Sequence, residues 1–319
     1  MQKFVIFSRD YRDYVKHWRA IQNDFEHVEC IYAGDNLEQA AFYIENAHIL
    51  LSEPDLASQV IEGAHHLTWL QSTWAGNEKL QLCAKRGYAL TGVKGIFSAK
   101  MREYVFAYIL YFQRYIAEFE VKQRKKVWWQ PRLETLAGKT LGIMGYGCIA
   151  KALDETARAF EMNVRAIVRD VAAHTDTRNK DIALFTLKEK ERFAAQCDYC
   201  VNLLPSTEET KGIIDTDFLS ALPKHAVLIN AGRGDAIQSE EALSKALNDK
   251  HLRAAVLDVC QQEPLEENSS LYTASNAWIT NHSAAISDPS SVFDVFTANL
   301  HLHITGKALM YQHDFSKGY

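Results

Sequence analysis

Three polar residues in the second half of the chain are of the types that carry out proton and anion chemistry. Arg233 lies in Asn-Ala-Gly-Arg-Gly, Glu263 in Gln-Gln-Glu-Pro and His282 in Thr-Asn-His-Ser. A carboxylate beside a histidine raises the pKa of the histidine and fixes its tautomer, and an arginine fork recognises a carboxylate and polarises a carbonyl. Together they would suit hydride transfer coupled to proton transfer. Taken singly, they are also explained as a turn residue, a loop carboxylate and a cap.

The segment TLGIMGYGCIA at residues 140–150 has the glycine spacing of a dinucleotide-binding turn. Its apolar start predicts a strand buried on both faces, which Gly145 and Gly147 end. Ala150 is the small third residue that lets the following helix, predicted over 149–160, pack against that strand. An ordinary strand-to-helix turn is the alternative, because glycine patterns also arise by chance. The residues expected to contact the cofactor at this turn are Gly145, Gly147, Cys148 and Ile149.

Short apolar runs alternate with helix-like segments along the chain, which predicts doubly wound parallel sheets. Before the glycine turn, strands are predicted at 4–7, 28–32, 49–51, 67–71 and 88–90. After it, they are predicted at 164–168, 198–204, 226–230, 254–259 and 278–280. Because the carboxyl ends of parallel strands converge on one crevice, Arg233, Glu263 and His282 are expected to meet there.

We expect an α/β protein of two doubly wound parallel-sheet domains. A dinucleotide-binding Rossmann domain over 99–286 is predicted to be inserted into a flavodoxin-like substrate-binding domain made of 1–98 and 287–319. The loop Thr-Trp-Ala-Gly-Asn-Glu at 73–78 directly follows a predicted strand of that first domain. This position makes it a candidate substrate contact, and a plain surface turn is the alternative.

A long helix is predicted from Ser98, which could cap it, to about Lys122. Aromatic residues lie on more than one of its faces, so it must be buried on several sides. Core packing plus a subunit interface explains that pattern best. We therefore expect a homodimer formed through the nucleotide domain and the helix over 99–122.

The composition is that of a soluble globular protein, with 319 residues, of which 47% are hydrophobic and 24% charged. A net charge of -5 gives no electrostatic reason to expect nucleic acid or an anionic membrane as partner. No basic segment followed by an apolar stretch opens the chain, and no apolar run is long enough to span a membrane. We therefore expect a cytoplasmic protein whose partner is a small-molecule substrate.

The six cysteines are irregularly spaced and do not form a disulfide framework. Cys197 and Cys200 form a CxxC pair, but no second pair or histidine lies at metal-ligand spacing. Two buried core thiols are favoured over a zinc site, and no metal is expected. Cys148 stands at the start of a predicted helix, where the backbone dipole can favour a thiolate. Oxidation or alkylation there could block the pyrophosphate site, although an inert residue in the turn is the simpler interpretation.

With these residues in place, the chain resembles the D-isomer-specific 2-hydroxyacid dehydrogenase family. The motifs that carry the resemblance are LPSTEETKGII at 204–214, NAGRGDAI at 230–237, AVLDVCQQEPL at 255–265 and TNHSAA at 280–285. Their order also matches the family, and GKALMYQHDFSKGY at 306–319 looks like its returning tail. Within the family, the chain is most similar to the glyoxylate/hydroxypyruvate reductase branch.

The resemblance implies that His282 is the acid/base, Glu263 its partner, and Arg233 the residue that binds the substrate carboxylate and carbonyl. The implied reaction is reduction of a small 2-keto acid, such as glyoxylate or hydroxypyruvate, to a D-2-hydroxy acid. The family also implies further contacts. By this resemblance, the backbone N–H groups of Trp74, Ala75 and Gly76 bind the substrate carboxylate. Ala231 and Asp258 bind the nicotinamide carboxamide. The other expected cofactor contacts are Leu204, Pro205 and Thr210.

The chain departs from the family pattern at two places. The family commonly has Gly-Val-Asp where this chain has Ala75, Gly76 and Asn77, and it has proline where Asn281 stands. These departures bear most on the identity of the substrate.

The cofactor preference depends on the end of the strand that follows the glycine turn, where NAD enzymes place an aspartate or glutamate. Alignment with the family puts Val168 there, with Arg169 next. Arginine can bind a 2′-phosphate, so NADP(H) is favoured. If the strand ends two residues later, Asp170 could take the ribose hydroxyls, and NAD(H) would then be preferred.

Two other functions remain open from the sequence. A 3-phosphoglycerate dehydrogenase is disfavoured because the chain ends at Tyr319, which leaves no room for the regulatory domain often appended there. A nucleotide-sensing corepressor without turnover is the other alternative, because such relatives keep the same arginine, glutamate and histidine.

Overall fold

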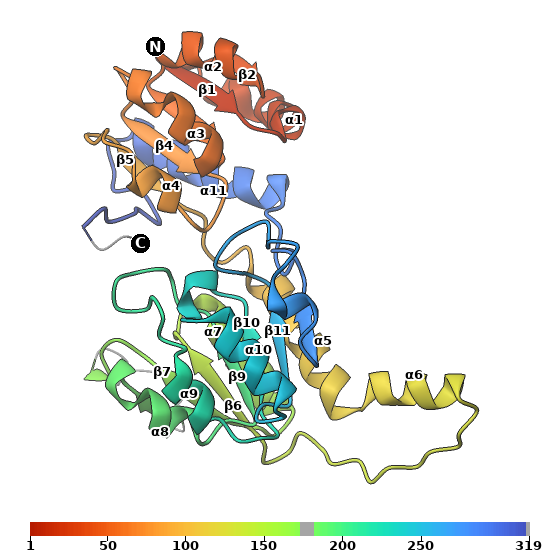
Figure 1. The fold of residues 1–319 in the computed structure, drawn as a ribbon. Helices are drawn as coiled ribbons and strands as arrows, with labels where there is room; N and C mark the ends of the chain where they lie inside the picture. Colours follow the sequence, from red (N-terminus) through yellow and green to blue (C-terminus); the bar gives the residue numbers. More distant parts are fainter. Residues whose placement is uncertain (173–181, 317–319) are drawn as a thin grey trace. The chain divides into compact units, whose positions relative to one another are not determined.

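The structure is a computed structural model that describes residues 1–172 and 182–316 (Figure 1). Residues 317–319 of the tail motif therefore lie outside the described residues. The chain forms two compact units, which we call the first unit (Met1–Ile96 with Ser287–Tyr319) and the second unit (Phe97–Ile286). Each unit contains one parallel β-sheet flanked by helices, which confirms the predicted α/β class with two doubly wound sheets.

The first unit is built on a five-stranded sheet in the order β2-β1-β3-β4-β5, the arrangement of flavodoxin-like folds. All of its pairings are parallel, and β1 lies between β2 and β3. The strands are β1 (Gln2–Phe7), β2 (Val28–Gly34), β3 (Ile49–Ser52), β4 (Trp69–Ser72) and β5 (Ala89–Thr91).

Helices cover both faces of this sheet because alternate residues of each strand point to opposite sides. Val5 and Phe7 pack in the cluster that includes residues of α2 and α3. On the other face, the rings of Phe4 and Trp69 stack on Phe296 of α11, with centroid distances of 4.8 and 5.2 Å. The helices are α1 (Tyr11–Ile21), α2 (Leu37–Ile44), α3 (Pro54–Val60), α4 (Glu78–Gln81) and α11 (Pro289–Ile304).

The second unit is built on a seven-stranded parallel sheet in the order β12-β11-β10-β9-β6-β7-β8. This is the Rossmann order extended by one strand, and the chain reverses direction across the sheet between β6 and β9. The sequence analysis missed β8, which has only three residues, two of them partly buried. The strands are β6 (Thr140–Met144), β7 (Asn163–Ile167), β8 (Ala183–Phe185), β9 (Tyr199–Asn202), β10 (Val227–Asn230), β11 (Ala254–Leu257) and β12 (Ala277–Ile279).

Two separate apolar clusters hold the helices of the second unit to its sheet. Phe106 of α5 and Leu153 of α7 are buried on one face, whereas Phe193, Phe218 and Leu243 of three other helices are buried on the other. The helices are α5 (Ser98–Gln113), α6 (Ile116–Arg124), α7 (Cys148–Ala159), α8 (Lys190–Ala194), α9 (Thr216–Ala221) and α10 (Glu240–Asn248). None of the helices in the described ranges combines the length and the apolar character needed to cross a bilayer.

The prediction of one long helix from Ser98 to about Lys122 was wrong. α5 ends at Gln113, Tyr115 adopts a left-handed conformation with φ of 55°, and α6 begins at Ile116. Tertiary contacts hold the end of α5, because Gln113 accepts a hydrogen bond from the hydroxyl of Tyr199 and donates to backbone oxygens of the segment before β6. Ser98 does not cap the helix either, since it is the first helical residue.

Candidate active site

His282 and Glu263 form a hydrogen-bonded pair at the carboxyl end of the seven-stranded sheet. His282 follows β12 and Glu263 follows β11, its neighbour in the sheet. The Nδ1 atom of His282 lies 2.8 Å from Oε2 of Glu263, and Oε1 of the same carboxylate accepts a hydrogen bond of 3.2 Å from the backbone N–H of Cys260. The carboxylate therefore favours the tautomer in which Nδ1 is protonated.

The pair is poised for proton transfer because each partner favours the charged form of the other. The hydrogen bond that His282 donates to Glu263 raises the pKa of His282, and the carboxylate outweighs partial burial and the positive charge of Arg233, which lower it. Partial burial raises the pKa of Glu263, but the hydrogen bond and charge of His282 outweigh it, so the net pKa is lowered. A protonated imidazolium is thus stabilised in contact with an ionised carboxylate.

Arg233 follows β10, the next strand of the sheet, and its charge acts on both members of this pair. Its backbone oxygen accepts a hydrogen bond of 3.1 Å from the side chain of Asn230. The next residue must be glycine, because a Cβ atom at Gly234 would lie 1.8 Å from the backbone oxygen of Cys260. This close approach holds the Arg233 loop against the loop that carries Glu263.

Asp258, the first residue after β11, fastens the loop that carries His282. This residue is only 4% exposed, and its Oδ1 atom accepts hydrogen bonds from the N–H groups of Ser283 (2.8 Å) and Ala284 (3.0 Å) and from the hydroxyl of Thr280 (2.7 Å). Its backbone oxygen accepts a fourth, of 2.6 Å, from the N–H of His282. The hydroxyl of Tyr104 in α5 lies 2.8 Å from that of Thr280 and extends this network. The expected contact of Asp258 with a nicotinamide carboxamide stays a prediction.

The glycine turn between β6 and α7 fits a dinucleotide. Gly145 has a φ of 91°, which side chains rarely adopt. A Cβ atom at Gly147 would meet no atom within 4 Å, so open space lies in front of the N-terminus of α7. Backbone N–H groups at a helix N-terminus bind phosphate, and the turn lies where the chain reverses across the sheet. Cys148 and Ile149 are the first two residues of that helix.

The end of β7 marks where the adenosine ribose of a dinucleotide would lie. The strand ends at Ile167, one residue earlier than predicted, so the later end that would favour Asp170 is not observed. Arg169 follows the strand, and its Nη2 atom donates to Oε2 of Glu209 at 2.9 Å. Oδ1 of Asp170 accepts a hydrogen bond of 2.8 Å from the N–H of Ala172.

The remaining predicted cofactor residues lie on the loops after β9 and β10. Leu204 is buried, whereas Pro205 is exposed. The hydroxyl of Thr210 donates to the backbone oxygen of Pro205 at 2.6 Å and accepts from the N–H of Thr207, so it holds the loop together. The N–H of Ala231 donates to the backbone oxygen of Asn202. Contacts of these residues with a cofactor stay predictions.

Comparisons with known proteins show which family the sequence and structure of this chain resemble. Residues 106–284 match the family described as D-isomer specific 2-hydroxyacid dehydrogenase, NAD binding domain. Glyoxylate/hydroxypyruvate reductase A of Yersinia enterocolitica is 31% identical over 224 residues, which cover 70% of this chain and 69% of that protein. Glyoxylate/hydroxypyruvate reductase A HPR2 of Arabidopsis thaliana is 28% identical over 260 residues, covering 79% and 80%.

The chain belongs to the D-isomer specific 2-hydroxyacid dehydrogenase family. A crystal structure of a member of this family from Aeromonas salmonicida has 33% sequence identity and a TM-score of 0.89, and the match covers 98% of this chain and 99% of that one. These findings confirm the resemblance predicted from the motifs. They also confirm that the chain is an enzyme of the NAD(P)-dependent 2-hydroxyacid dehydrogenase class.

One departure from the motifs of this dehydrogenase family has a backbone consequence. Asn281 and His282 both have left-handed backbone conformations, with φ of 53° and 56°. A proline ring fixes φ near −65°, so proline could not adopt the conformation that Asn281 has here. Asparagine tolerates positive φ better than most residues. Proline at this position would therefore require a different backbone conformation just before His282.

The predicted carboxylate-binding loop of this dehydrogenase, Trp74 to Gly76, follows β4 in the first unit. The N–H of Trp74 already donates to the hydroxyl oxygen of Ser72 at 3.1 Å, and the backbone oxygen of Trp74 accepts from the same hydroxyl. The N–H of Trp74 is thus used within the loop in this structure, and its expected contact with a substrate carboxylate stays a prediction. The expected contacts of Ala75 and Gly76 with the substrate also stay predictions.

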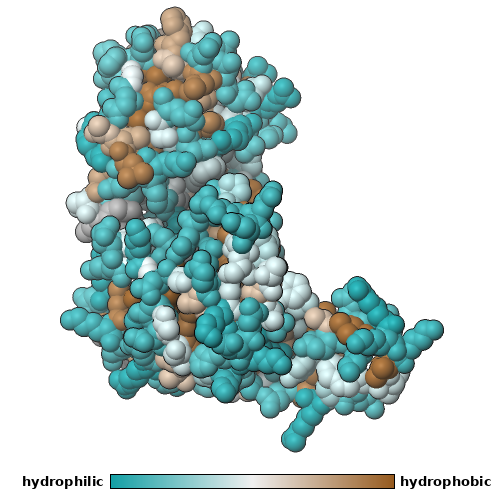
Figure 2. Space-filling view, viewed as in Figure 1, coloured by the Kyte–Doolittle hydropathy of each residue, from teal (hydrophilic) through white to brown (hydrophobic). Residues whose placement is uncertain are grey.

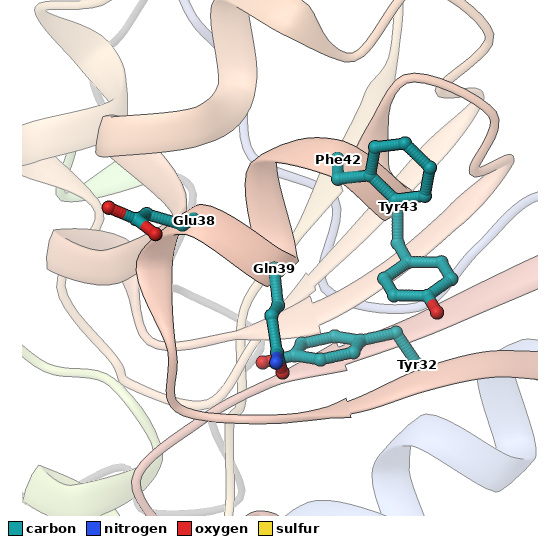
Figure 3. A pocket seen from close by; sticks show the side chains of 5 residues that line it. All are labelled: Tyr32, Glu38, Gln39, Phe42 and Tyr43. Carbon is teal, nitrogen blue, oxygen red and sulfur yellow. The ribbon is translucent and has the colours of Figure 1, made fainter.

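A cavity is present in each of the two units. A shallow cavity of about 380 Å³ in the first unit is lined by Tyr32, Glu38, Gln39, Phe42 and Tyr43 and contains none of the predicted site residues (Figure 3). A second cavity of about 460 Å³, in the second unit, is lined by Tyr104 and by Ser283 and Ala284, which follow His282 directly. The residues that line this second cavity likewise include none of the predicted site residues.

Of the three cysteines considered in the sequence, two lie in the core and one lies on the surface. Cys197 and Cys200 are both fully buried, which confirms the prediction of two core thiols. A hydrogen bond between them, together with burial, raises the pKa of Cys197 well above its ordinary value. Cys148 is exposed at the start of α7, and its proposed sensitivity to oxidation or alkylation stays a prediction.

Two features of the site were missed by the sequence analysis. Glu209 lies within the quoted motif at 204–214, but its contact with Arg169 joins residues 40 positions apart and has no local signal. Asp258 was predicted as a cofactor contact, whereas its hydrogen bonds to the residues around His282 span about two dozen positions. Strand order could have suggested only the second, because Asp258 follows β11 and His282 follows β12, which lies beside it in the sheet.

Proposed function

We propose that this enzyme reduces small 2-keto acids of the glyoxylate and hydroxypyruvate type to D-2-hydroxy acids, with NADPH as the preferred reductant. The observation that carries the proposal is the hydrogen bond between His282 and Glu263, at the carboxyl end of the dinucleotide-type sheet and within the field of Arg233. The two reductases compared above have glyoxylate and hydroxypyruvate in their names, which supports this substrate class.

The proposed mechanism uses each of the three residues for one task. Arg233 binds the substrate carboxylate and polarises the carbonyl through its guanidinium fork. A bound reduced nicotinamide would supply the hydride that the keto carbon accepts. Protonated His282 then gives its Nε2 proton to the carbonyl oxygen, which becomes the hydroxyl of the product. Glu263 stays ionised, orients the ring through Nδ1 and stabilises the imidazolium before transfer.

The preference for NADPH is proposed on the end of β7. Val168 and Arg169 directly follow this strand, so the strand end itself carries no carboxylate, and Arg169 offers a guanidinium to a 2′-phosphate. Gly145, Gly147, Cys148 and Ile149 would hold the pyrophosphate through the turn and the N-terminus of α7. NADH remains the alternative reductant.

We also propose that the enzyme is a homodimer that associates through α6 and the segment after it. In the second unit, α6 extends away from the sheet, and Figure 2 shows hydrophobic surface over it. The apolar residues exposed there are Ile116, Phe119, Val121, Val127 and Trp128. An apolar patch of this kind on a projecting element is typical of a surface covered by a second copy. The expected cytoplasmic location stays a prediction.

A spectroscopic assay tests the proposed function. Purified protein is mixed with NADPH and, in separate reactions, with glyoxylate, hydroxypyruvate, pyruvate and 3-phosphohydroxypyruvate, and the absorbance of the reduced nicotinamide is followed. Glyoxylate or hydroxypyruvate should give the highest kcat/KM. A clear preference for the phosphorylated substrate would instead indicate a 3-phosphoglycerate dehydrogenase. Binding of NADPH without oxidation by any keto acid would favour a nucleotide sensor.

A further inference from the structure

We propose that Glu209 determines whether the enzyme accepts a 2′-phosphate or a 2′-hydroxyl on the adenosine ribose of its cofactor. In this role Glu209 holds Arg169 in the free enzyme, opposes the phosphate, and accepts a hydrogen bond from the hydroxyl. The inference rests on the proposed function, because it requires that the glycine turn of the second unit bind a nicotinamide dinucleotide.

The strand order brings these two residues together around the glycine turn. β6 leads into the turn and lies between β7 and β9 in the sheet. Arg169 follows β7, and Glu209 lies on the loop that follows β9. The contact of 2.9 Å between Nη2 of Arg169 and Oε2 of Glu209 therefore joins the loops on the two sides of the turn. Both side chains remain accessible to a ligand, with exposed fractions of 53% for Arg169 and 60% for Glu209.

The loop that carries Glu209 is held in shape by its neighbour. Thr210 is 6% exposed, and its hydroxyl donates to the backbone oxygen of Pro205 at 2.6 Å and accepts from the N–H of Thr207 at 2.9 Å. The backbone next to Glu209 is thus anchored, whereas its carboxylate points to Arg169. This arrangement gives the carboxylate a defined position beside the end of β7.

The position of Glu209 supplies the carboxylate that the end of β7 lacks. NAD enzymes place an acidic residue there to accept hydrogen bonds from the ribose hydroxyls, and a carboxylate repels a 2′-phosphate. In this chain the acidic group comes from a different loop and is already paired with the arginine that would bind the phosphate. Exposed ion pairs are weak, so a phosphate can take Arg169 from Glu209, but the remaining negative charge then opposes it.

Two nucleotides that lack the nicotinamide separate these effects in a binding experiment. The dissociation constants of 2′,5′-ADP and of ADP are measured by titration calorimetry for the wild-type chain and for Glu209→Gln. The neutral variant should bind 2′,5′-ADP about threefold to tenfold more tightly, because one negative charge near the phosphate is removed. It should bind ADP about twofold to threefold more weakly, because a neutral amide is a poorer acceptor for the ribose hydroxyl.

Two further variants make the result specific. Glu208→Gln removes the same charge from an exposed neighbouring residue and should change both constants less than about twofold. Arg169→Gln should weaken 2′,5′-ADP binding about tenfold or more, and adding Glu209→Gln to it should restore only part of that loss. Thermal unfolding of each variant verifies that the fold is kept.

The possible outcomes separate this inference from the proposed function. If Glu209→Gln changes the ratio of the two constants no more than Glu208→Gln does, Glu209 does not determine the choice, and the inference is overturned. In that case the wild-type chain would still bind both nucleotides, and the proposed function would stand. If the wild-type chain binds neither nucleotide, the glycine turn is not a dinucleotide site, and the proposed function itself fails.

Discussion

The chemistry proposed for this enzyme depends on how one imidazole is held. Glu263 hydrogen-bonds Nδ1 of His282, while four hydrogen bonds from the surrounding loop to Asp258 fix the backbone that presents the ring. The pKa of His282 is raised and that of Glu263 lowered, so the pair stays charged when most free histidines have lost their proton. At the residue scale, this arrangement leads to two predictions.

The first prediction concerns the acid itself. His282→Gln should lower kcat for keto-acid reduction about 10²- to 10⁴-fold, because glutamine cannot deliver a proton to the carbonyl oxygen. The dissociation constant of NADPH, measured by nicotinamide fluorescence, should change little, since His282 is not assigned to the cofactor. Turnover close to that of the wild type would remove His282 from the mechanism.

The second prediction concerns the pH dependence of reduction. Reduction requires protonated His282. The value of kcat/KM should therefore be highest below the pKa of this residue and should fall as the pH rises through it. Glu263→Gln removes the group that raises this pKa, and the fall should therefore move to a lower pH. The exposed Glu267→Gln is the matched control and should leave the profile in place. An unshifted profile in Glu263→Gln would show that the carboxylate does not support the imidazolium.

At the scale of a single element, two glycines of the turn between β6 and α7 should differ in what they contribute to the stability of the fold and to the binding of NADPH. Gly145→Ala should lower the free energy of unfolding by about 1–2 kcal/mol, because alanine is strained at a φ of 91° and its Cβ atom would press on Leu204 at 3.3 Å. Gly147→Ala should leave that free energy within about 1 kcal/mol of the wild type, since its Cβ atom enters open space.

The same two variants should differ in NADPH binding. The open space in front of Gly147 is where a pyrophosphate would approach the backbone, so Gly147→Ala should weaken NADPH binding about tenfold or more. Denaturant unfolding and NADPH titration measure the two effects independently. If Gly147→Ala binds NADPH as the wild type does, the pyrophosphate does not lie against this turn.

At the scale of the whole molecule, α6 is a helix with no buried residue in the fold of one chain. Ile116 and Val121 are 49% and 48% exposed on it. Ile116→Asp should convert a dimer into monomers in analytical ultracentrifugation, because burying a carboxylate in an apolar interface is unfavourable. Leu82→Asp places the same charge on an exposed apolar residue of the first unit and should leave the mass unchanged. A wild-type chain that sediments as a monomer would contradict the proposed dimer.

The sequence by itself determined the class of fold and the family, because both depend on patterns that are local. The alternation of apolar runs with helical segments predicts parallel sheets, and the spacing of Gly145, Gly147 and Ala150 predicts the turn at the edge of one of them. The family motifs follow strands in a fixed order, so Arg233, Glu263 and His282 could be named as candidates before any distance was known. Their catalytic roles stay predictions.

Only the tertiary structure decided the features that depend on contacts between distant residues. The break between α5 and α6 reflects the anchoring of Gln113 by Tyr199, which lies 86 positions away. The network from Tyr104 to Asp258 crosses 176 positions between Tyr104 and Thr280, and the contact between Arg169 and Glu209 crosses 40. Strand order brings such residues together, and no local pattern of residue types encodes which side chains then meet.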